Sequence, residues 1–204
     1  MNELDLAVIH DAKNNLGGLA LRLEKLGNFS SEIEMLMHTS NRLTNLLLWH
    51  KHQEQGMRIN IEANSPSDLI SEISNEYCPL FPHIKIESNT EKAPMIWFYD
   101  ELYIRLALEN AMHNACQFAK NKVQISVEES NGFLVFKLCD DGPGFSKSII
   151  ENHSANKFSD LSRRGTGLGL VLSSSIASMH INKEKNGNVS LHNSHGAVFE
   201  MFIP

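Results

Sequence analysis

Cysteine is scarce in this chain of 204 residues, which has only Cys78, Cys116 and Cys139. Their number is odd and no two of them stand in a CxxC spacing. The sequence therefore argues against a disulfide framework and against a structural zinc site. A reducing compartment fits this use of cysteine.

Long apolar runs are missing as well. No stretch approaches the ~18–20 apolar residues that a membrane-spanning helix needs. Glu3 and Asp5 interrupt the first residues, and no basic segment precedes an apolar one, so a signal peptide is not predicted. We expect a soluble, cytoplasmic protein with no membrane insertion.

Basic residues are outnumbered by acidic ones: the chain has 18 Lys and Arg and 24 Asp and Glu, which gives a formal net charge of -6. With no basic run either, this balance argues against a nucleic-acid partner. Convincing metal-ligand spacing is also absent among five histidines, which we predict to be surface residues: His50, His52, His180, His192 and His195.

The chain is long enough for a helical hairpin and one α/β domain, and its pattern changes near Gly56. Residues 3–26 and 32–55 are predicted as two helices, with Gly27 as the C-cap of the first and a capping box of Ser31 and Glu34 opening the second. Two amphipathic helices alone bury too little surface to be stable. We therefore expect residues 1–56 to form an antiparallel four-helix bundle with a second copy, in a homodimer.

Residues 57–204 mix strand and helix patterns, which predicts a two-layer α/β sandwich with its helices on one face and an α+β fold class overall. Helices are predicted from Ser65 towards Cys78, over 100–120 and over 168–179. Strands are predicted at 58–62, 84–87, 94–98, 123–128, 133–139, 189–192 and 197–203.

Two glycine-rich turns are the most informative local feature. The first, residues 140–145, reads Asp-Asp-Gly-Pro-Gly-Phe, and the second, residues 164–170, reads Arg-Gly-Thr-Gly-Leu-Gly-Leu. Glycine lets a backbone approach a ligand closely, an acidic residue can accept from an exocyclic amine, and a helix start offers free N–H groups to phosphate. No Gly-Lys-Ser/Thr follows, and the glycine spacing is not a dinucleotide fingerprint. The pair predicts a nucleotide pocket of another type.

A third segment supports this interpretation. Asn110 and Asn114 are four residues apart on the helix predicted over 100–120, so their side chains share one face. Two neutral amide oxygens suit a hydrated Mg²⁺ that phosphates also hold. Any single Asn pair can equally be a solvated face, so the pair matters because it accompanies the glycine turns.

These three segments resemble the N, G1 and G2 boxes of the GHKL-type ATP-binding domain of sensor histidine kinases. The resemblance implies that Asn114 binds Mg²⁺, that Asn110 lies nearby on the catalytic face, and that Asp140 binds the adenine amine. Residues 146–164, with Phe158, correspond to the mobile lid over ATP. The implied cofactor-binding set is Asn114, Asp140, Gly142, Gly144, Gly165, Thr166, Gly167, Leu168 and Gly169. Arg163 and Arg164 join this set because they stand just before the second glycine turn, where they can offset phosphate charge, although each can equally be an ordinary solvated residue.

The N-terminus fits the same family, because His10-Asp11-Ala12-Lys13-Asn14 resembles its H box. Placed at 100° per residue, His10 and Asn14 fall opposite the apolar stripe of their helix, where a core histidine would not lie. A neutral exposed imidazole is a competent nucleophile near pH 7, and Asp11 can act as base or hold the tautomer.

The resemblance implies a two-step reaction. ATP with Mg²⁺ gives its γ-phosphoryl group to His10, and a response-regulator receiver domain then takes that group onto an aspartate. Asn14 stands where the family positions water for dephosphorylation of the same partner, so phosphatase activity is a further hypothesis.

Three departures from the family pattern bear on this expectation. Gln117 replaces a basic residue that many relatives carry, which gives Arg163 or Arg164 a compensating role. Asn15 replaces a common proline, so the first helix should be less kinked. His10 lies close to Met1, which fits either an excised catalytic core or a stand-alone kinase; if Met1 is the natural start, regulation by a separate sensor protein in trans is favoured.

Two alternatives stay open at this point. The main one is a histidine phosphotransferase or pseudokinase relay of the same architecture without ATP turnover, which decayed glycine boxes would mark. The other is a non-kinase member of the ATPase fold, or a serine kinase acting on an anti-sigma antagonist. These lack an N-terminal hairpin with a His-Asp-x-x-Asn face.

Overall fold

The structure is a computed structural model of the 204-residue chain. It describes residues 58–154 and 168–204, and before them positions 12, 15, 16, 18, 19, 22, 23, 26, 27, 29, 32, 33, 35, 36, 39, 40, 43 and 44. For residues 154 and 168 it describes the backbone alone. The chain divides into two compact units, Met1–Arg58 and Ile59–Pro204.

In the first unit, the described positions from 12 to 26 and from 32 to 44 are helical. Gly27 breaks the helical run with a φ of 71°, and its N–H donates to the carbonyl oxygen of Leu23 at 3.2 Å. This is the geometry of a left-handed helix C-cap, so the prediction for Gly27 is confirmed. The capping box predicted at Ser31 and Glu34 lies outside the described residues, and the four-helix bundle stays a prediction.

The second unit is built on a five-stranded sheet of order β2-β4-β5-β9-β8. Only β2 and β4 pair in parallel, and the other neighbours are antiparallel. The strands are β2 (Lys85–Asn89), β4 (Lys122–Ser130), β5 (Phe133–Asp140), β8 (Asn188–Asn193) and β9 (Ala197–Ile203).

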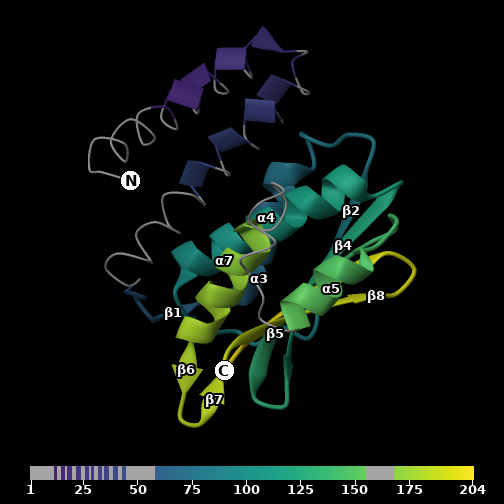
Figure 1. The fold of residues 1–204 in the computed structure, drawn as a ribbon. Coiled ribbons are helices and arrows are strands. Elements are labelled where there is room, and N and C mark those ends of the chain that lie inside the picture. The colour runs from purple at the N-terminus through teal and green to yellow at the C-terminus, as the bar shows by residue number, and fades with distance from the viewer. Residues whose placement is uncertain are drawn as a thin grey trace. The chain divides into compact units, whose positions relative to one another are not determined.

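Helices cover one face of this sheet (Figure 1). They are α3 (Pro66–Tyr77), α4 (Glu101–Phe118), α5 (Lys147–Ser154) and α7 (Leu168–Met179). Two small antiparallel ribbons lie outside the main sheet, β1 (Glu62–Asn64) with β3 (Trp97–Tyr99) and β6 (Ile181–Asn182) with β7 (Lys185–Asn186). The predicted two-layer α/β sandwich is confirmed.

The core lies between the helices and the inner face of the sheet. Side chains alternate between the two faces of a strand, so Ile125 of β4 and Phe136 of β5 point inward and are fully buried. Leu108 of α4 and Leu172 of α7 are fully buried in the helical layer. Burial of such side chains is the main favourable term in folding.

Local signals set the helix starts. Ser65 accepts the N–H of Asp68 at 3.4 Å, and Pro66 occupies the first turn of α3, where its missing N–H costs nothing. Asp100 accepts the N–H of Tyr103 at 3.1 Å and caps α4.

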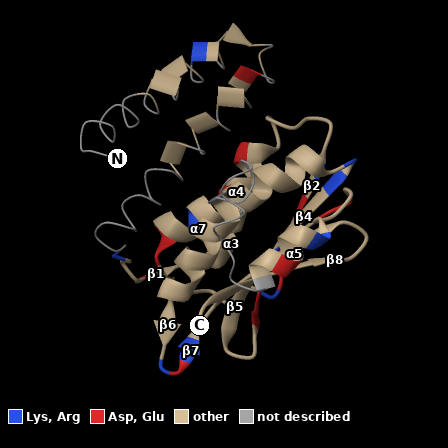
Figure 2. Ribbon diagram, in the orientation of Figure 1, with Lys and Arg blue, Asp and Glu red and all other residues tan. Residues whose placement is uncertain are grey.

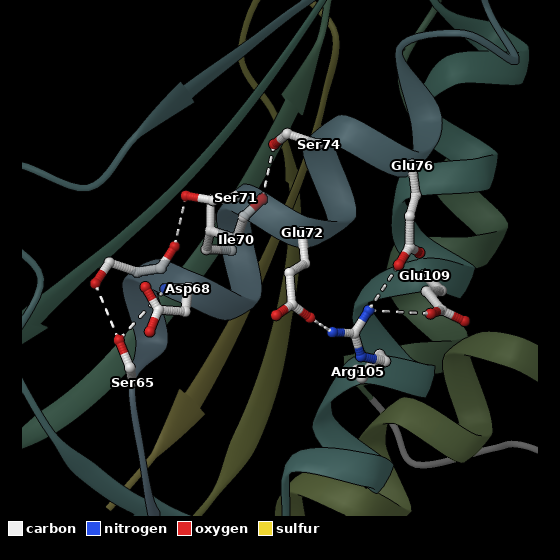
Figure 3. A network of polar contacts seen from close by, with 10 residues as sticks. Ser65, Asp68, Ile70, Ser71, Glu72, Ser74, Glu76, Arg105 and Glu109 are labelled. Carbon is white, nitrogen blue, oxygen red and sulfur yellow. Dashed lines mark hydrogen bonds and ion pairs between the residues drawn. The ribbon is translucent and has the colours of Figure 1, made fainter.

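Figure 3 shows how α3 and α4 are joined at the surface by Arg105. The Arg105 guanidinium pairs with Glu72. Its Nη1 atom also lies 3.3 Å from Oε1 of Glu76 and 3.9 Å from Oε1 of Glu109. Behind it, the Tyr77 hydroxyl donates to the carbonyl oxygen of Glu109 at 3.0 Å. The half-buried neighbourhood of Arg105 favours these pairs over fully exposed ones.

One strand was predicted too early in the chain. The strand predicted at 58–62 is observed as β1 at Glu62–Asn64, and the N–H of Asn60 donates to the Asp100 carboxylate at 2.7 Å instead of pairing with a neighbouring strand. The segment 146–164, which corresponds to the lid, starts with helix α5, where the carbonyl oxygen of Ser146 accepts the N–H groups of Ile149 and Ile150. Its residues 155–164 lie outside the described residues, so the lid stays a prediction.

His180 was also predicted wrongly as a surface residue, because its exposed fraction is 2%. Its Nε2 accepts the N–H of Asp100 at 3.1 Å, and its Nδ1 donates to the carbonyl oxygen of Ile176 at 2.8 Å. Burial lowers the pKa of this imidazole. His180 therefore joins the end of α7 to the start of α4 as a neutral side chain.

Candidate functional site

A cavity of about 270 Å³ opens between α4, α5, α7 and the ends of β5 and β9. Three polar residues, Asn114, Asp140 and Ser146, line it. Its apolar wall is formed chiefly by Phe118, Leu138, Phe145, Ile149, Leu170 and Phe199. A flat apolar ring that carries a hydrogen-bond donor matches this lining.

Asp140, the last residue of β5, presents one carboxylate oxygen to the protein and keeps the other for the cavity. Oδ1 accepts the N–H groups of Gly142 at 2.8 Å and Ala197 at 3.2 Å. Oδ2 accepts no hydrogen bond from any residue that the structure describes. The arrangement fixes the carboxylate of this cavity-lining residue and leaves one acceptor oxygen available to a ligand donor.

The neighbouring Asp141 has a structural role. Its Oδ1 accepts the N–H groups of Lys120, Asn121 and Lys122 at 2.8, 3.0 and 3.2 Å, at the turn between α4 and β4. These hydrogen bonds lower the pKa of Asp141 to about 2, and the one from the Asn121 N–H has the largest effect. The two adjacent aspartates thus have different roles, because Asp140 lines the cavity and Asp141 holds the α4–β4 turn. The sequence alone does not distinguish these roles.

Glycine is required where the first glycine turn meets its neighbours. A Cβ on Gly142 would stand 2.4 Å from the carbonyl oxygen of Phe118, and Gly144 has a φ of 79°. The contact at Gly196, in the turn between β8 and β9, is closer still, because a Cβ added there would lie 1.9 Å from the carbonyl oxygen of Asp140. Sequence reasoning missed Gly196, because nothing nearby in the chain marks its contact.

The two amides of α4 occupy different environments. Asn114 lines the cavity, whereas Asn110 is 9% exposed and packs beside α7. A Cβ on Gly169 would lie 3.6 Å from Cβ and Cγ of Asn110, so the first turn of α7 runs close to α4. Gly169, in the first turn of α7, therefore lies against Asn110 of α4.

Several predicted site residues cannot be placed. Leu168 begins α7, but its side chain is not described. The others lie outside the described residues: His10, Asp11, Asn14, Phe158, Arg163, Arg164, Gly165, Thr166 and Gly167.

The donor set fits a magnesium ion held mainly by a nucleotide. Among the described residues, no group of three His, Cys, Asp or Glu could hold a metal ion. Mg²⁺ keeps several waters and takes few protein ligands beside phosphate oxygens, and the Asn114 amide oxygen is a suitable hard ligand.

Fold and cavity together define a nucleotide-binding α/β domain. Residues 99–204 match the family described as histidine kinase-, DNA gyrase B-, and HSP90-like ATPase, which is more than half of the chain. The chain belongs to this ATPase family.

Relatives of known name narrow the likeness. Sensor protein KdpD of Clostridium acetobutylicum is 29% identical over 170 residues, which is 79% of this chain and 18% of that protein. The chain thus spans less than a fifth of that relative's length. None of the helices in the described part of the chain combines the length and hydropathy needed to cross a membrane.

Solved structures agree on the fold. The catalytic domain of histidine kinase ThkA has a TM-score of 0.60 and 22% identity, over 72% of this chain and 98% of that one. Full-length ShkA in complex with AMPPNP has a TM-score of 0.69 and 19% identity, over all of this chain and 46% of that one. The second unit has the histidine-kinase type of ATP-binding fold.

Proposed function

We propose that this chain is the catalytic core of a two-component sensor histidine kinase, which phosphorylates itself on His10 with ATP and Mg²⁺. Residues 57–204 bind ATP, and residues 1–56 form the dimerisation and phosphotransfer hairpin. The observation that carries the proposal is the cavity in which the Asp140 carboxylate faces an apolar wall beside Asn114. It lies in the segment that matches an ATPase family.

The adenine ring is assigned to the apolar part of the cavity. Its exocyclic amine donates to Oδ2 of Asp140, the carboxylate oxygen without a described partner. Because Oδ1 already accepts two backbone N–H groups, the carboxylate cannot turn away from the base. Phe118, Phe145 and Phe199 supply flat apolar surface around the ring.

The phosphate groups are assigned to the start of α7 and the glycine run before it. Free N–H groups at a helix start bind phosphate oxygens, and Gly165, Thr166, Gly167, Leu168 and Gly169 stand in that position. Arg163 and Arg164 offset phosphate charge. Asn114, with Asn110 behind it on α4, holds Mg²⁺, which when bound neutralises charge on the phosphates.

Phosphoryl transfer uses His10 as nucleophile. A lone pair of the neutral imidazole attacks the γ-phosphorus, the bond to the bridging oxygen breaks, and ADP leaves. Asp11 takes the proton that the imidazole loses. A receiver-domain aspartate of a response regulator then accepts the phosphoryl group, and Asn14 positions the water of a phosphatase reaction.

The assembly that we propose is a cytoplasmic homodimer without nucleic-acid partners. In the single chain, Leu19 and Met35 of the first unit are 46% and 70% exposed, and a partner hairpin would cover such apolar side chains.

Incubation with γ-labelled ATP and Mg²⁺ tests the proposal, with wild type compared with His10→Ala and Asp140→Asn. We expect acid-labile label on wild type and on neither variant. Binding of ATP by the wild type without label would instead favour a phosphotransferase or pseudokinase relay, in which Gln117 stands for the missing basic residue.

A further inference from the structure

Asn193, the last residue of β8, makes two hydrogen bonds to a single residue of the glycine turn. Its Oδ1 accepts the N–H of Phe145 at 2.8 Å, and its Nδ2 donates to the carbonyl oxygen of Phe145 at 2.9 Å. One side-chain amide thus satisfies both backbone groups of Phe145, as a neighbouring strand would. No other described residue bonds to either group.

The amide also lies against the glycine before Phe145. A Cβ on Gly144 would stand 2.8 Å from Cγ and Oδ1 of Asn193, so only a glycine lets the two approach. Gly144 has a φ of 79°, a conformation that glycine adopts without strain. Turn and amide therefore fit each other closely.

The same end of the β8–β9 hairpin reaches the other end of the turn. Asn193 pairs with Ala197 in the strand register, and the N–H of Ala197 donates to Oδ1 of Asp140. Ala197, the first residue of β9, therefore holds the turn at Asp140, and its register partner Asn193 holds the turn at Phe145. Asp140, Gly144 and Phe145 all line the cavity, whereas Asn193 does not.

We propose that Asn193 is a positioning residue of the nucleotide site: it holds Gly144 and Phe145 in the shape that receives the base, without touching the ligand. This inference rests on the proposed ATP binding and deepens it. The segment from Asp141 to Ser146 connects β5 to α5; Asp141 holds its first residue to the α4–β4 turn, and Asn193 holds Phe145 near its end.

Loss of the amide leaves the Phe145 backbone groups to water and gives the turn conformational freedom. Nucleotide binding must then order the turn again, which weakens affinity. Two neutral hydrogen bonds and one ordered turn correspond to roughly a tenfold loss.

The test is titration of the full chain with ADP, which binds without phosphoryl transfer. Asn193→Ala is expected to raise the dissociation constant about tenfold. Asn188→Ala, the same change at an exposed site at the other end of β8, is the matched control and should leave the dissociation constant unchanged. In ATP turnover, Asn193→Ala should raise KM and leave kcat near wild type, because the turn contributes uniform binding.

A second variant and a second measurement guard against a general folding defect. Asn193→Asp keeps the shape and the acceptor for the Phe145 N–H, but it sets a carboxylate against the Phe145 carbonyl, so it should weaken ADP binding as the alanine variant does. Hydrogen exchange at the Phe145 amide should accelerate in Asn193→Ala without nucleotide, while exchange at the core amide of Phe136 stays slow.

The outcomes separate the two proposals. If wild type binds no ADP, the proposed function fails. If wild type binds ADP and a folded Asn193→Ala binds it equally well, or if Phe145 exchange does not change, the positioning role of Asn193 is overturned while the proposed function stands.

Discussion

The two faces of the five-stranded sheet use charge in opposite ways. On the outer face, Glu87 lies 2.8 Å from Lys85 and 2.7 Å from Lys122, and Lys137 lies 2.9 Å from Glu200. Figure 2 shows charged residues of both signs along β2. On the inner face, which carries the buried Ile125 and Phe136, the Asp140 carboxylate stands at the end of β5 and keeps one oxygen without a described partner. A paired carboxylate on an open face contributes little to stability, whereas a fixed carboxylate with one oxygen left to accept is suited to binding a ligand.

The largest effect on stability should follow a change that displaces the backbone of Asp140, the residue that carries the inner carboxylate. Gly196→Ala places a Cβ within 1.9 Å of the Asp140 carbonyl oxygen, which the backbone must move to avoid. We expect the free energy of unfolding to fall by about 3 kcal/mol and ATP affinity to fall with it. Chemical denaturation measures the first quantity.

The control for this prediction is Gly18→Ala in the first unit, a helical position where a Cβ meets nothing within 4 Å. It should leave stability unchanged or raise it by about 0.5–1 kcal/mol. Equal destabilisation by both variants would refute the importance of the contact between Gly196 and Asp140.

His180 tests the buried layer behind the inner face. His180→Ala leaves the N–H of Asp100 without its acceptor and should cost about 2 kcal/mol of unfolding free energy. In the wild type, burial lowers the pKa of His180 below its ordinary 6.5, so the unfolded chain binds the proton more tightly.

Stability should therefore be full above about pH 6.5 and decrease as pH falls below it, through the folded pKa of His180. Burial also lowers the pKa of His153, which adds to the same trend. Thermal melts at pH 7.5 and 5.5 check this, and His180→Gln should show a smaller difference between the two. An unchanged pH dependence of the melting temperature in His180→Gln would mean that another group causes the loss of stability at low pH.

Asp141 should give a smaller change in a lower pH window. Its pKa is lowered to about 2 by backbone N–H groups, so its contribution is present above the ordinary value of 3.8 and lost as pH falls towards 2. Asp141→Asn should lower the melting temperature at pH 7 modestly and by less at pH 2.5. A constant difference between the two pH values would contradict this account.

The outer face should respond least. The Glu87 side chain is 33% exposed, and its hydrogen bonds with Lys122 and Lys85 lower its pKa to about 2. Glu87→Gln should shift the melting temperature by no more than about 1 °C at 0.15 M salt, because water and salt screen such pairs. A larger loss would mean that the outer face carries a stabilising network.

Local patterns predicted much of the fold. The periodic apolar residues of α7 gave its bounds, Leu168–Met179, and the Asn131-Gly132 pair gave the β4–β5 hairpin, where both residues have φ near 60°. Asp140 and Asn114 were likewise found from local spacing, and both line the cavity.

What the sequence did not predict depends on contacts distant in the chain. Asn193 bonds to Phe145, 48 residues away, and the burial of His180 follows from its bond to Asp100, 80 residues away. No local periodicity encodes either partner. The β6–β7 ribbon was missed because two-residue strands carry no alternation to detect.

Titration with ATP and Mg²⁺ of wild type, Asp140→Asn and Asp141→Asn tests the central claim most directly. In Asp140→Asn the amide oxygen can still accept the N–H groups of Gly142 and Ala197, which turns an NH₂ donor towards the adenine amine. We predict that Asp140→Asn loses roughly 10- to 100-fold in affinity, whereas a folded Asp141→Asn binds as wild type does. Equal affinities of wild type and Asp140→Asn would contradict the assignment of this cavity to ATP.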